Sequence, residues 1–389
     1  MKTIAILFFI SLFIVFYTYL GYGILLFILI KIKRIFVKKK DLLSYDEHPE
    51  ITLLITAYNE KDYIHSKVSN SMELEYPSEK LKFVWVTDGS NDGTPDILRQ
   101  YENIAVYHQD SRKGKIAAMN RAIKFVTSPI VVFSDANTML GKESIKIIAE
   151  LFRDPKTGCV SGEKRVQIKD KDIAAGAGEG IYWKYESKLK KWDAELYSAV
   201  GAAGELFAIR THLFKEVEPD TLLDDFIISL RVAMMGYKID YNPDAYALES
   251  PSASVKEELK RKIRIAAGGI QSVVRLKSLL NIFKYGVLSF QYISHRVFRW
   301  TLAPLMIPII FILNIVLAKV GIFYEITLYL QILFYAMALL GWYLQSKKIN
   351  FKILFIPYYF LMMNYAVYRG FFRYISNSQS VKWERAKRG

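Results

Sequence analysis

The chain has 389 residues, of which 52% are hydrophobic, and its formal net charge is +15. This length is enough for a full catalytic domain with chain left over, and the single cysteine, Cys159, excludes an internal disulfide and a cysteine-based zinc site. The basic residues cluster beside apolar runs, so we attribute the excess charge to contact with anionic lipid and expect no nucleic-acid partner.

The first apolar run covers residues 4–30 and contains no charged residue. At about 1.5 Å per residue it is long enough for a hydrocarbon core of roughly 30 Å, and it is longer than the apolar core of a signal peptide. Basic residues follow at once, which is the positive-inside pattern; they are Lys31, Lys33, Arg34, Lys38, Lys39 and Lys40. We therefore expect a transmembrane helix over residues 1–30, a basic linker over 31–48 and a cytosolic domain over 49–254.

Short apolar runs alternate with helical patterns in this domain. Strands are expected at residues 51–56, 83–87, 104–107, from 130 and at 206–209, with helices at 62–72, 114–125, 181–196 and 223–235. This alternation predicts an α/β protein with a doubly wound sheet. Ligands of such sheets bind outside the carboxyl ends of the strands, so the polar residues that follow the strands are expected to line one crevice.

The C-terminal part of the chain is expected to contact the membrane. Residues 255–296 are predicted to form amphipathic helices at its surface. Apolar runs at 298–318, 322–344 and 351–368 predict transmembrane helices over 297–375, followed by a basic tail over 376–389. Asn364 and Arg369 in the third run suit an interface or a protein-lined face. If all three runs crossed, the tail would lie outside, so one of them could be re-entrant or interfacial.

Three expected strand ends carry the polar residues Tyr58-Asn59-Glu60, Asp88 and Asp135. Carboxylates and amides at one crevice can hold a base, a ribose and a divalent cation, and Mg²⁺ or Mn²⁺ is usually shared with substrate phosphates. A nucleotide diphosphate therefore fits this crevice better than a neutral metabolite. The chain lacks the glycine-rich motifs of phosphate-loop ATPases and dinucleotide dehydrogenases.

Several motifs in this order resemble those of membrane-bound family 2 glycosyltransferases. They are residues 56–60 (TAYNE), 86–94 (VTDGSNDGT), 114–120 (GKIAAMN), 133–137 (FSDAN), 201–210, 224–226 (DDF) and 261–271. The resemblance covers roughly residues 50 to 275. It implies an inverting enzyme with a GT-A fold, that is, a doubly wound mixed sheet with helices on both faces.

The resemblance also implies which residues bind the nucleotide sugar. Asp88 matches the nucleoside-binding aspartate, and Lys115 would lie near the nucleotide. Asp135 matches the first acid of the family's Asp-Xaa-Asp motif, which binds the sugar nucleotide and its metal, and Asn137 replaces the second acid. The same nucleotide pocket is expected to include Tyr58, Asn59, Glu60 and Ser90. An amide brings no charge, so the metal affinity is expected to be lower than that of a two-acid site.

The family's general base corresponds to Asp225, which would deprotonate the acceptor hydroxyl, with Asp224 where Glu is common. Alternatively, the pair merely begins a helix, where the dipole favours acids. Processive members often carry Gln-Xaa-Xaa-Arg-Trp, but residues 261–265 read Arg-Lys-Ile-Arg-Ile and keep only Arg264 of that motif. Arg261 and Arg264 are expected to bind the diphosphate, with lipid contact as the alternative.

The resemblance implies an integral protein of the cell membrane that transfers a sugar from a nucleotide-diphosphate sugar, most commonly a UDP-sugar, to a lipid-linked or glycan acceptor. The missing tryptophan favours one or few transfers over a processive polysaccharide synthase with a secretion channel. Two other functional classes fit the sequence less well. A sugar nucleotidyltransferase would need a glycine-rich basic signature near residues 56–60, and an inactive scaffold would not need Asp88, Asp135 and Asp225 together.

Overall fold

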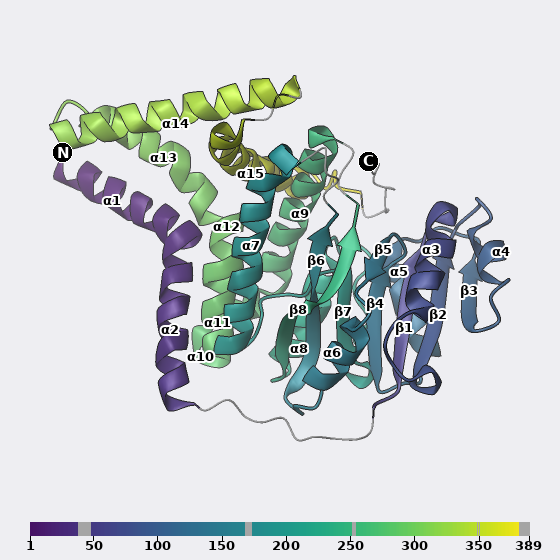
Figure 1. The fold of residues 1–389 in the computed structure, drawn as a ribbon. Coiled ribbons are helices and arrows are strands. Elements are labelled where there is room, and N and C mark those ends of the chain that lie inside the picture. The colour runs from purple at the N-terminus through teal and green to yellow at the C-terminus, as the bar shows by residue number, and fades with distance from the viewer. Residues whose placement is uncertain (38–47, 168–172, 251–253, 348, 350, 381–389) are drawn as a thin grey trace.

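A computed structural model describes residues 1–37, 48–167, 173–250, 254–347, 349 and 351–380. It has two parts, an α/β domain built on one sheet and an array of long apolar helices at its side (Figure 1). The second half of the basic linker and most of the basic tail predicted from the sequence lie outside the described residues.

The sheet has eight strands in the order β3-β2-β1-β4-β7-β6-β8-β5. Strands β3, β2, β1 and β4 are parallel to one another, β7 is antiparallel to its neighbours β4 and β6, and β5 is antiparallel to β8. The predicted doubly wound mixed sheet is therefore confirmed. The strands are β1 (Ile51–Ala57), β2 (Leu81–Asp88), β3 (Ile104–Gln109), β4 (Ile130–Asp135), β5 (Thr138–Leu140), β6 (Thr157–Val166), β7 (Leu206–Arg210) and β8 (Lys238–Glu249).

Alternate residues of each central strand enter two separate cores, as the period of two requires. Leu53 and Ile55 of β1 lie in one core and Leu54 in the other. The first core is covered by α3 (Lys61–Met72), α4 (Thr94–Leu98) and α6 (Ser144–Leu151). The second is covered by α5 (Lys115–Ala122), α8 (Asp224–Met234) and the short helix α11 (Val287–Tyr292). Helices thus cover both faces, and polar strand ends are left at the edge.

Helices long and apolar enough to cross a membrane are present at both ends of the chain. Within the described residues these are Lys2–Phe36 and Ile322–Gln345, and a third is possible if Val287–Trp300 and Leu302–Leu317, which are bent by 53°, form one span. The first comprises α1 (Lys2–Phe16), a π-helical turn and α2 (Tyr22–Phe36); the others contain α12 (Phe298–Trp300), α13 (Leu302–Leu317) and α14 (Ile322–Ser346).

The last helix, α15 (Lys352–Ile375), is packed against protein. It lies along α9 (Val255–Arg275), and a Cβ at Gly370 would stand 2.7 Å from Ala266 Cβ. Asn364 is buried and accepts a hydrogen bond from Tyr19 Oη at 2.7 Å, so the predicted protein-lined face is present. The apolar face of α9 is covered by this contact, and the location of residues 255–296 at the membrane surface stays a prediction.

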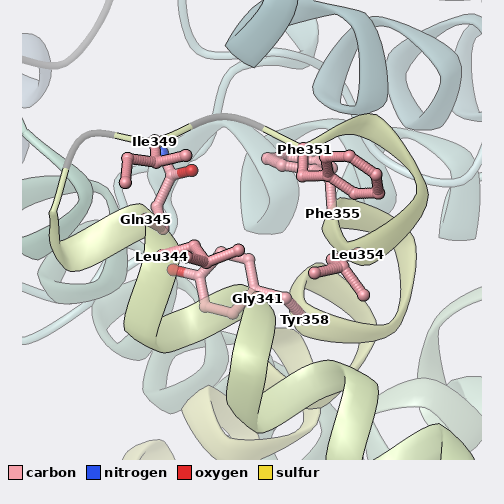
Figure 2. Close-up of a pocket in the computed structure, with 8 residues that line it drawn as sticks. All are labelled: Gly341, Leu344, Gln345, Ile349, Phe351, Leu354, Phe355 and Tyr358. Carbon is pink, nitrogen blue, oxygen red and sulfur yellow. The ribbon is translucent and has the colours of Figure 1, made fainter.

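A small, mostly apolar pocket lies where α14 and α15 meet (Figure 2). Its lining is Gly341, Leu344, Gln345, Ile349, Phe351, Leu354, Phe355 and Tyr358. None of the residues predicted to bind a nucleotide sugar belongs to this lining. The pocket is therefore separate from the candidate active site at the strand ends.

Candidate active site

The loops that follow β1 and β2 are bonded to each other. Asn59 has a left-handed backbone with φ of 53°, and its side chain bonds Asn91 twice, each time at 3.0 Å. The backbone N–H of Asn59 donates to Ser90 Oγ at 3.1 Å, and that of Glu60 donates to Thr94 Oγ1 at 3.1 Å. The sequence motifs at these two strand ends therefore form one hydrogen-bonded rim, and its role in nucleotide binding stays a prediction.

Asp88 is buried at the end of β2 and organises the next loop. Its Oδ2 accepts hydrogen bonds from the backbone N–H of Lys113 at 2.9 Å and of Gly114 at 2.6 Å. Its Oδ1 is buried and has no hydrogen-bond partner among the described residues. A buried acceptor without a donor is costly, and an N–H or O–H of a ligand would satisfy it. The guanidinium of Arg112 stands 3.8 Å from the centre of the Tyr58 ring, beside this loop.

Lys115 begins α5, directly after the loop that Asp88 holds, and joins acids from two other elements. Its Nζ lies 2.8 Å from Asp135 Oδ1 at the end of β4 and 3.7 Å from Asp224 Oδ2 at the start of α8. Burial alone would lower the pKa of Lys115. The charges of Asp135 and Asp224 raise this pKa by more than burial lowers it, so the pKa of Lys115 lies above its ordinary value. The pKa of Asp135 is raised by burial, which Lys115 offsets only in part. One stable ammonium therefore stands between two carboxylates.

Asp225 follows Asp224 in the first turn of α8 and faces the glycine-rich loop before β7. A Cβ at Gly204 would lie 3.2 Å from Asp225 Oδ2. Burial, together with the neighbouring charge of Asp224, raises the pKa of Asp225 to about 7, although Lys115 acts in the opposite direction. A carboxyl group with a pKa near neutrality is suited to take up a proton and release it again.

The two arginines predicted to bind the diphosphate differ in their surroundings. Arg261 lies 3.7 Å from Glu205 Oε1 and 3.7 Å from Glu258 Oε2. Glu205 is also paired with the buried Lys164 at 2.6 Å, and these cations outweigh the effect of burial and lower its pKa. Arg264 is half-buried and forms no ion pair with any described residue. The structure brings Arg261 into the ionic cluster of the site and leaves Arg264 outside it.

The predicted metal ligands lie in the short turn between β4 and β5. Asp135 ends β4, and Asn137 is half-buried in the turn. In the part of the chain that the structure describes, no group of three His, Cys, Asp or Glu side chains could enclose a metal ion. The oxygens of one carboxylate and one amide fit Mg²⁺ or Mn²⁺, provided that substrate phosphates and water complete the coordination.

Two further residues belong to this region but were not predicted. Glu205 lies between Lys164 and Arg261, and the fully buried Lys67 of α3 donates hydrogen bonds on both sides of the Asp135 turn. Burial lowers the pKa of Lys67 to about 7, although Asp135 acts in the opposite direction. The sequence does contain a sign that Lys67 is buried. Lys67 stands three residues after Ile64 and one before Val68, so it falls on the apolar face of the helix.

Comparisons with known proteins agree with this architecture. Residues 48–268 match the family described as "Glycosyltransferase like family 2". Poly-beta-1,6-N-acetyl-D-glucosamine synthase of Staphylococcus aureus (strain MSSA476) is 29% identical over 255 residues, and that of Staphylococcus epidermidis is 25% identical over 255 residues. Each alignment covers 62% of this chain, which spans only about 60% of the length of these relatives.

A solved structure shares the fold over nearly the whole chain. It is the mannosyltransferase PcManGT from Pyrobaculum calidifontis in complex with GDP-Man and Mn²⁺, with a TM-score of 0.71 and 21% identity. The superposition covers 96% of this chain and 100% of that one. Because the family match extends over residues 48–268, which is more than half of the chain, this protein belongs to the family 2 glycosyltransferases and has their GT-A fold.

Proposed function

We propose that this enzyme transfers a sugar from a nucleotide-diphosphate sugar to a lipid-linked or glycan acceptor at the cytoplasmic face of the cell membrane, in cell-surface polysaccharide or glycolipid synthesis. The observation that carries the proposal is the position of Lys115 between two acids. Its Nζ lies 2.8 Å from Asp135 Oδ1 and 3.7 Å from Asp224 Oδ2, and Asp225 follows Asp224 in the chain. These residues come from separate parts of the sequence, and each was predicted from a motif of the same family.

The nucleotide is proposed to bind at the joint rim of the β1 and β2 loops. The buried Oδ1 of Asp88 offers an acceptor to the base or the ribose, and Tyr58, Asn59, Glu60 and Ser90 would line the same pocket. The diphosphate would extend from there toward Lys115, which follows the loop bonded to Asp88, and toward Arg261. A UDP-sugar is our first candidate because uridine diphosphate is the commonest carrier in the family, whereas the solved mannosyltransferase holds GDP-Man.

The proposed reaction is a single displacement that inverts the anomeric configuration. Asp225 removes the proton of the acceptor hydroxyl while that oxygen attacks the anomeric carbon from the side opposite the leaving group. The ammonium of Lys115 is held in place by Asp135 and Asp224, so it faces the negative charge that grows on the diphosphate without a reorganisation at that moment. A divalent cation bound by Asp135 and Asn137 would neutralise further charge on the leaving group.

The test of this function starts from donor binding by the full chain in detergent. UDP- and GDP-sugars are screened for a rise in the thermal unfolding midpoint, with and without Mn²⁺, and the best donor is then used in radiolabelled form with membranes. We expect one donor to stabilise the protein and to label a lipid-extractable product. If no sugar nucleotide binds and none is consumed, the proposal is wrong.

A processive polysaccharide synthase is the second candidate, and two observations favour it. The staphylococcal relatives described above are poly-beta-1,6-N-acetyl-D-glucosamine synthases. In addition, Trp300 lies against Gly269 of α9, about one turn after the position where the processive motif has its Trp, and packs edge-on against Phe226 with 5.3 Å between ring centres. Product length decides between the two candidates, because single transfers yield a short glycolipid and processive synthesis yields a polymer retained at the origin of the chromatogram.

A further inference from the structure

A buried lysine lies behind the turn that carries the proposed metal ligands. Lys67 of α3 has no exposed surface, and its Nζ donates to Ser134 Oγ at 2.8 Å and to the carbonyl oxygen of Thr138 at 2.6 Å. Ser134 precedes Asp135 and Thr138 follows Asn137. One side chain from another part of the sequence therefore holds both ends of the five-residue segment Ser134–Thr138, which presents Asp135 and Asn137.

The turn also has a hydrogen-bond network of its own, and Lys67 completes it. Thr138 Oγ1 donates to the carbonyl oxygen of Asp135 at 3.0 Å, and the hydroxyls of Ser134 and Thr138 lie 3.3 Å apart. These bonds connect residues that are close in sequence and shape the turn. The sheet pairs Ser134 with Ile55 and Leu206 and pairs Thr138 with Glu249, and the side chain of Lys67 additionally bonds both ends of the turn to a helix that packs on the sheet.

Stability of the fold does not explain why a lysine stands here. Both hydrogen-bond partners of the ammonium are neutral oxygens, and an ammonium taken out of water without a directly paired anion is costly. A methionine of similar length would fill the same space on the apolar face of α3 at no such cost. Departures of this kind from the local folding rules are expected at functional sites.

We propose that Lys67 is a positioning residue of the active site, which fixes the Asp135–Asn137 turn in the orientation that receives the cation and the donor diphosphate. The inference rests on the proposed function for the identity of the ligand, but the restraint on the turn belongs to the protein alone. Partners that orient metal ligands in this way typically affect metal affinity by about 10- to 100-fold.

The same helix offers a matched control. One turn after Lys67, Asn70 donates from Nδ2 to the carbonyl oxygen of Leu140 at 2.9 Å and accepts from the backbone N–H of Leu140 at 2.7 Å. Asn70 thus attaches α3 to β5 through two hydrogen bonds, and both of them go to Leu140, outside the segment from Ser134 to Thr138. A merely structural effect of the α3–β5 contact would appear equally in variants of both residues.

The experiment compares the full-length variants Lys67→Met, Lys67→Gln and Asn70→Ala in detergent. Binding of Mn²⁺ in the presence of inorganic pyrophosphate is followed by the electron paramagnetic resonance signal of free Mn²⁺. We expect Lys67→Met to weaken binding about 10-fold or more and Asn70→Ala to leave it nearly unchanged. Lys67→Gln should recover part of the loss, because an amide can donate to the same two oxygens. Equal losses in Lys67→Met and Asn70→Ala would overturn the proposal.

A second measurement needs no ligand and separates this inference from the proposed function. Amide hydrogen exchange is measured by mass spectrometry on peptides that cover residues 134–140. Faster exchange there in Lys67→Met, with unchanged exchange in the neighbouring strands, supports the positioning role even if no donor is ever found. Unchanged exchange in this peptide overturns the role, whereas a wild-type protein that binds no sugar nucleotide contradicts the proposed function only.

Discussion

Asp225 is an acid of the candidate site whose environment raises its pKa. Burial and the charge of Asp224 raise its pKa to about 7, with Lys115 acting in the opposite direction. The same carboxyl group would titrate near 4 in an unfolded chain. A general base works only in its ionised form, so the environment that makes Asp225 a competent proton acceptor also places its titration in the physiological range.

The first prediction concerns the pH dependence of transfer. Below a pH of about 7 the rate should fall about tenfold per pH unit, because the fraction of ionised Asp225 falls by that factor. Above this pH the rate should level off. Initial rates measured between pH 5.5 and 8.5 check this prediction.

The substitution Asp225→Asn tests the same role directly. This variant should lose more than about nine tenths of the rate while it still binds donor. A variant that kept more activity would refute the role of the base.

The same group gives a stability effect of known sign. The pKa of Asp225 is higher in the folded state than in the unfolded state, so the folded state holds its proton more tightly and loses stability as the pH rises toward and through 7. Asp225→Asn should therefore raise the thermal midpoint at pH 8 and have little effect at pH 4. Asp244→Asn is the control, because the Asp244 side chain is 76% exposed.

The second prediction concerns Gly89, which follows Asp88. Gly89 has φ of 69°, and an added Cβ would lie 2.6 Å from Arg112 Cβ and 2.9 Å from Arg112 Cα. Gly89→Ala should push away the loop that Asp88 binds and weaken donor binding. Gly93→Ala is the matched control, since Gly93 has a similar φ of 89° but no atom within 4 Å of the added Cβ. Both variants should lose about 1–3 kcal/mol through backbone strain, and only Gly89→Ala should raise the KM for donor.

At the scale of elements, the apolar helices are joined to the catalytic domain by a buried ionic cluster on α7 (Ile173–Leu196). Glu186 of α7 lies 2.7 Å from Arg296, 2.7 Å from Arg299 and 3.1 Å from His295. His295 also contacts Asp193 at 2.5 Å, and Asp193 accepts a hydrogen bond from Tyr22 of α2. One cluster thus ties the first apolar helix, α7 and the helices before α13 together.

The third prediction follows from this cluster. Burial opposes ionisation of Glu186, but the two arginines and His295 outweigh it, so its pKa lies well below the usual range. Glu186→Gln leaves two arginines without their carboxylate in a buried place, which typically costs about 3–5 kcal/mol. Glu195→Gln removes an exposed pair with Arg34 and should cost less than about 1 kcal/mol. Thermal unfolding of both variants in detergent measures the difference.

At the scale of the whole molecule, α1 packs along α13, and its N-terminal end lies near the start of α14 (Figure 1). Helix α15 packs against α9, α14 and α7. Phe8 packs on Tyr324 at 5.6 Å and Phe9 on Phe323 at 6.0 Å between ring centres. We propose that Lys2–Phe36, residues 298–317 (α12 and α13) and α14 all cross the membrane, whereas α11 stays with the catalytic domain on whose core it packs. The N-terminus and residue 321 would then share one side, while the catalytic domain, α15 and the basic tail would share the cytoplasmic side, which satisfies the positive-inside tendency.

The fourth prediction tests this arrangement with thiol labelling in intact cells. The native Cys159 is buried and should give little background. Gly321→Cys should react with a membrane-impermeant maleimide, because an added Cβ there has no atom within 4 Å. Ser378→Cys should react only after the cells are opened. Labelling of Ser378→Cys in intact cells, with the protein folded, would contradict the proposed three crossings.

The sequence by itself determined the parallel half of the sheet and the family. The strands β1, β2, β3 and β4 are apolar runs that end in polar residues, and a buried parallel strand has to read that way because both of its faces are covered. Asp88 and Asp135 could be named for the same reason, since strand ends are local features, whereas Asp225 was named from the resemblance to the family. Their catalytic and binding roles stay predictions.

Only the tertiary structure decided how charged residues in the second half of the domain are buried. Strands β6 and β8 were not predicted. Lys164 of β6 and Glu249 of β8 are charged residues at buried positions, so they interrupt the apolar pattern by which a strand is recognised. Lys67 and Glu205 were missed for a related reason. A charge is tolerated inside a protein when partners from distant parts of the chain surround it, and the identity of those partners is set by the fold and cannot be read from the neighbouring residues.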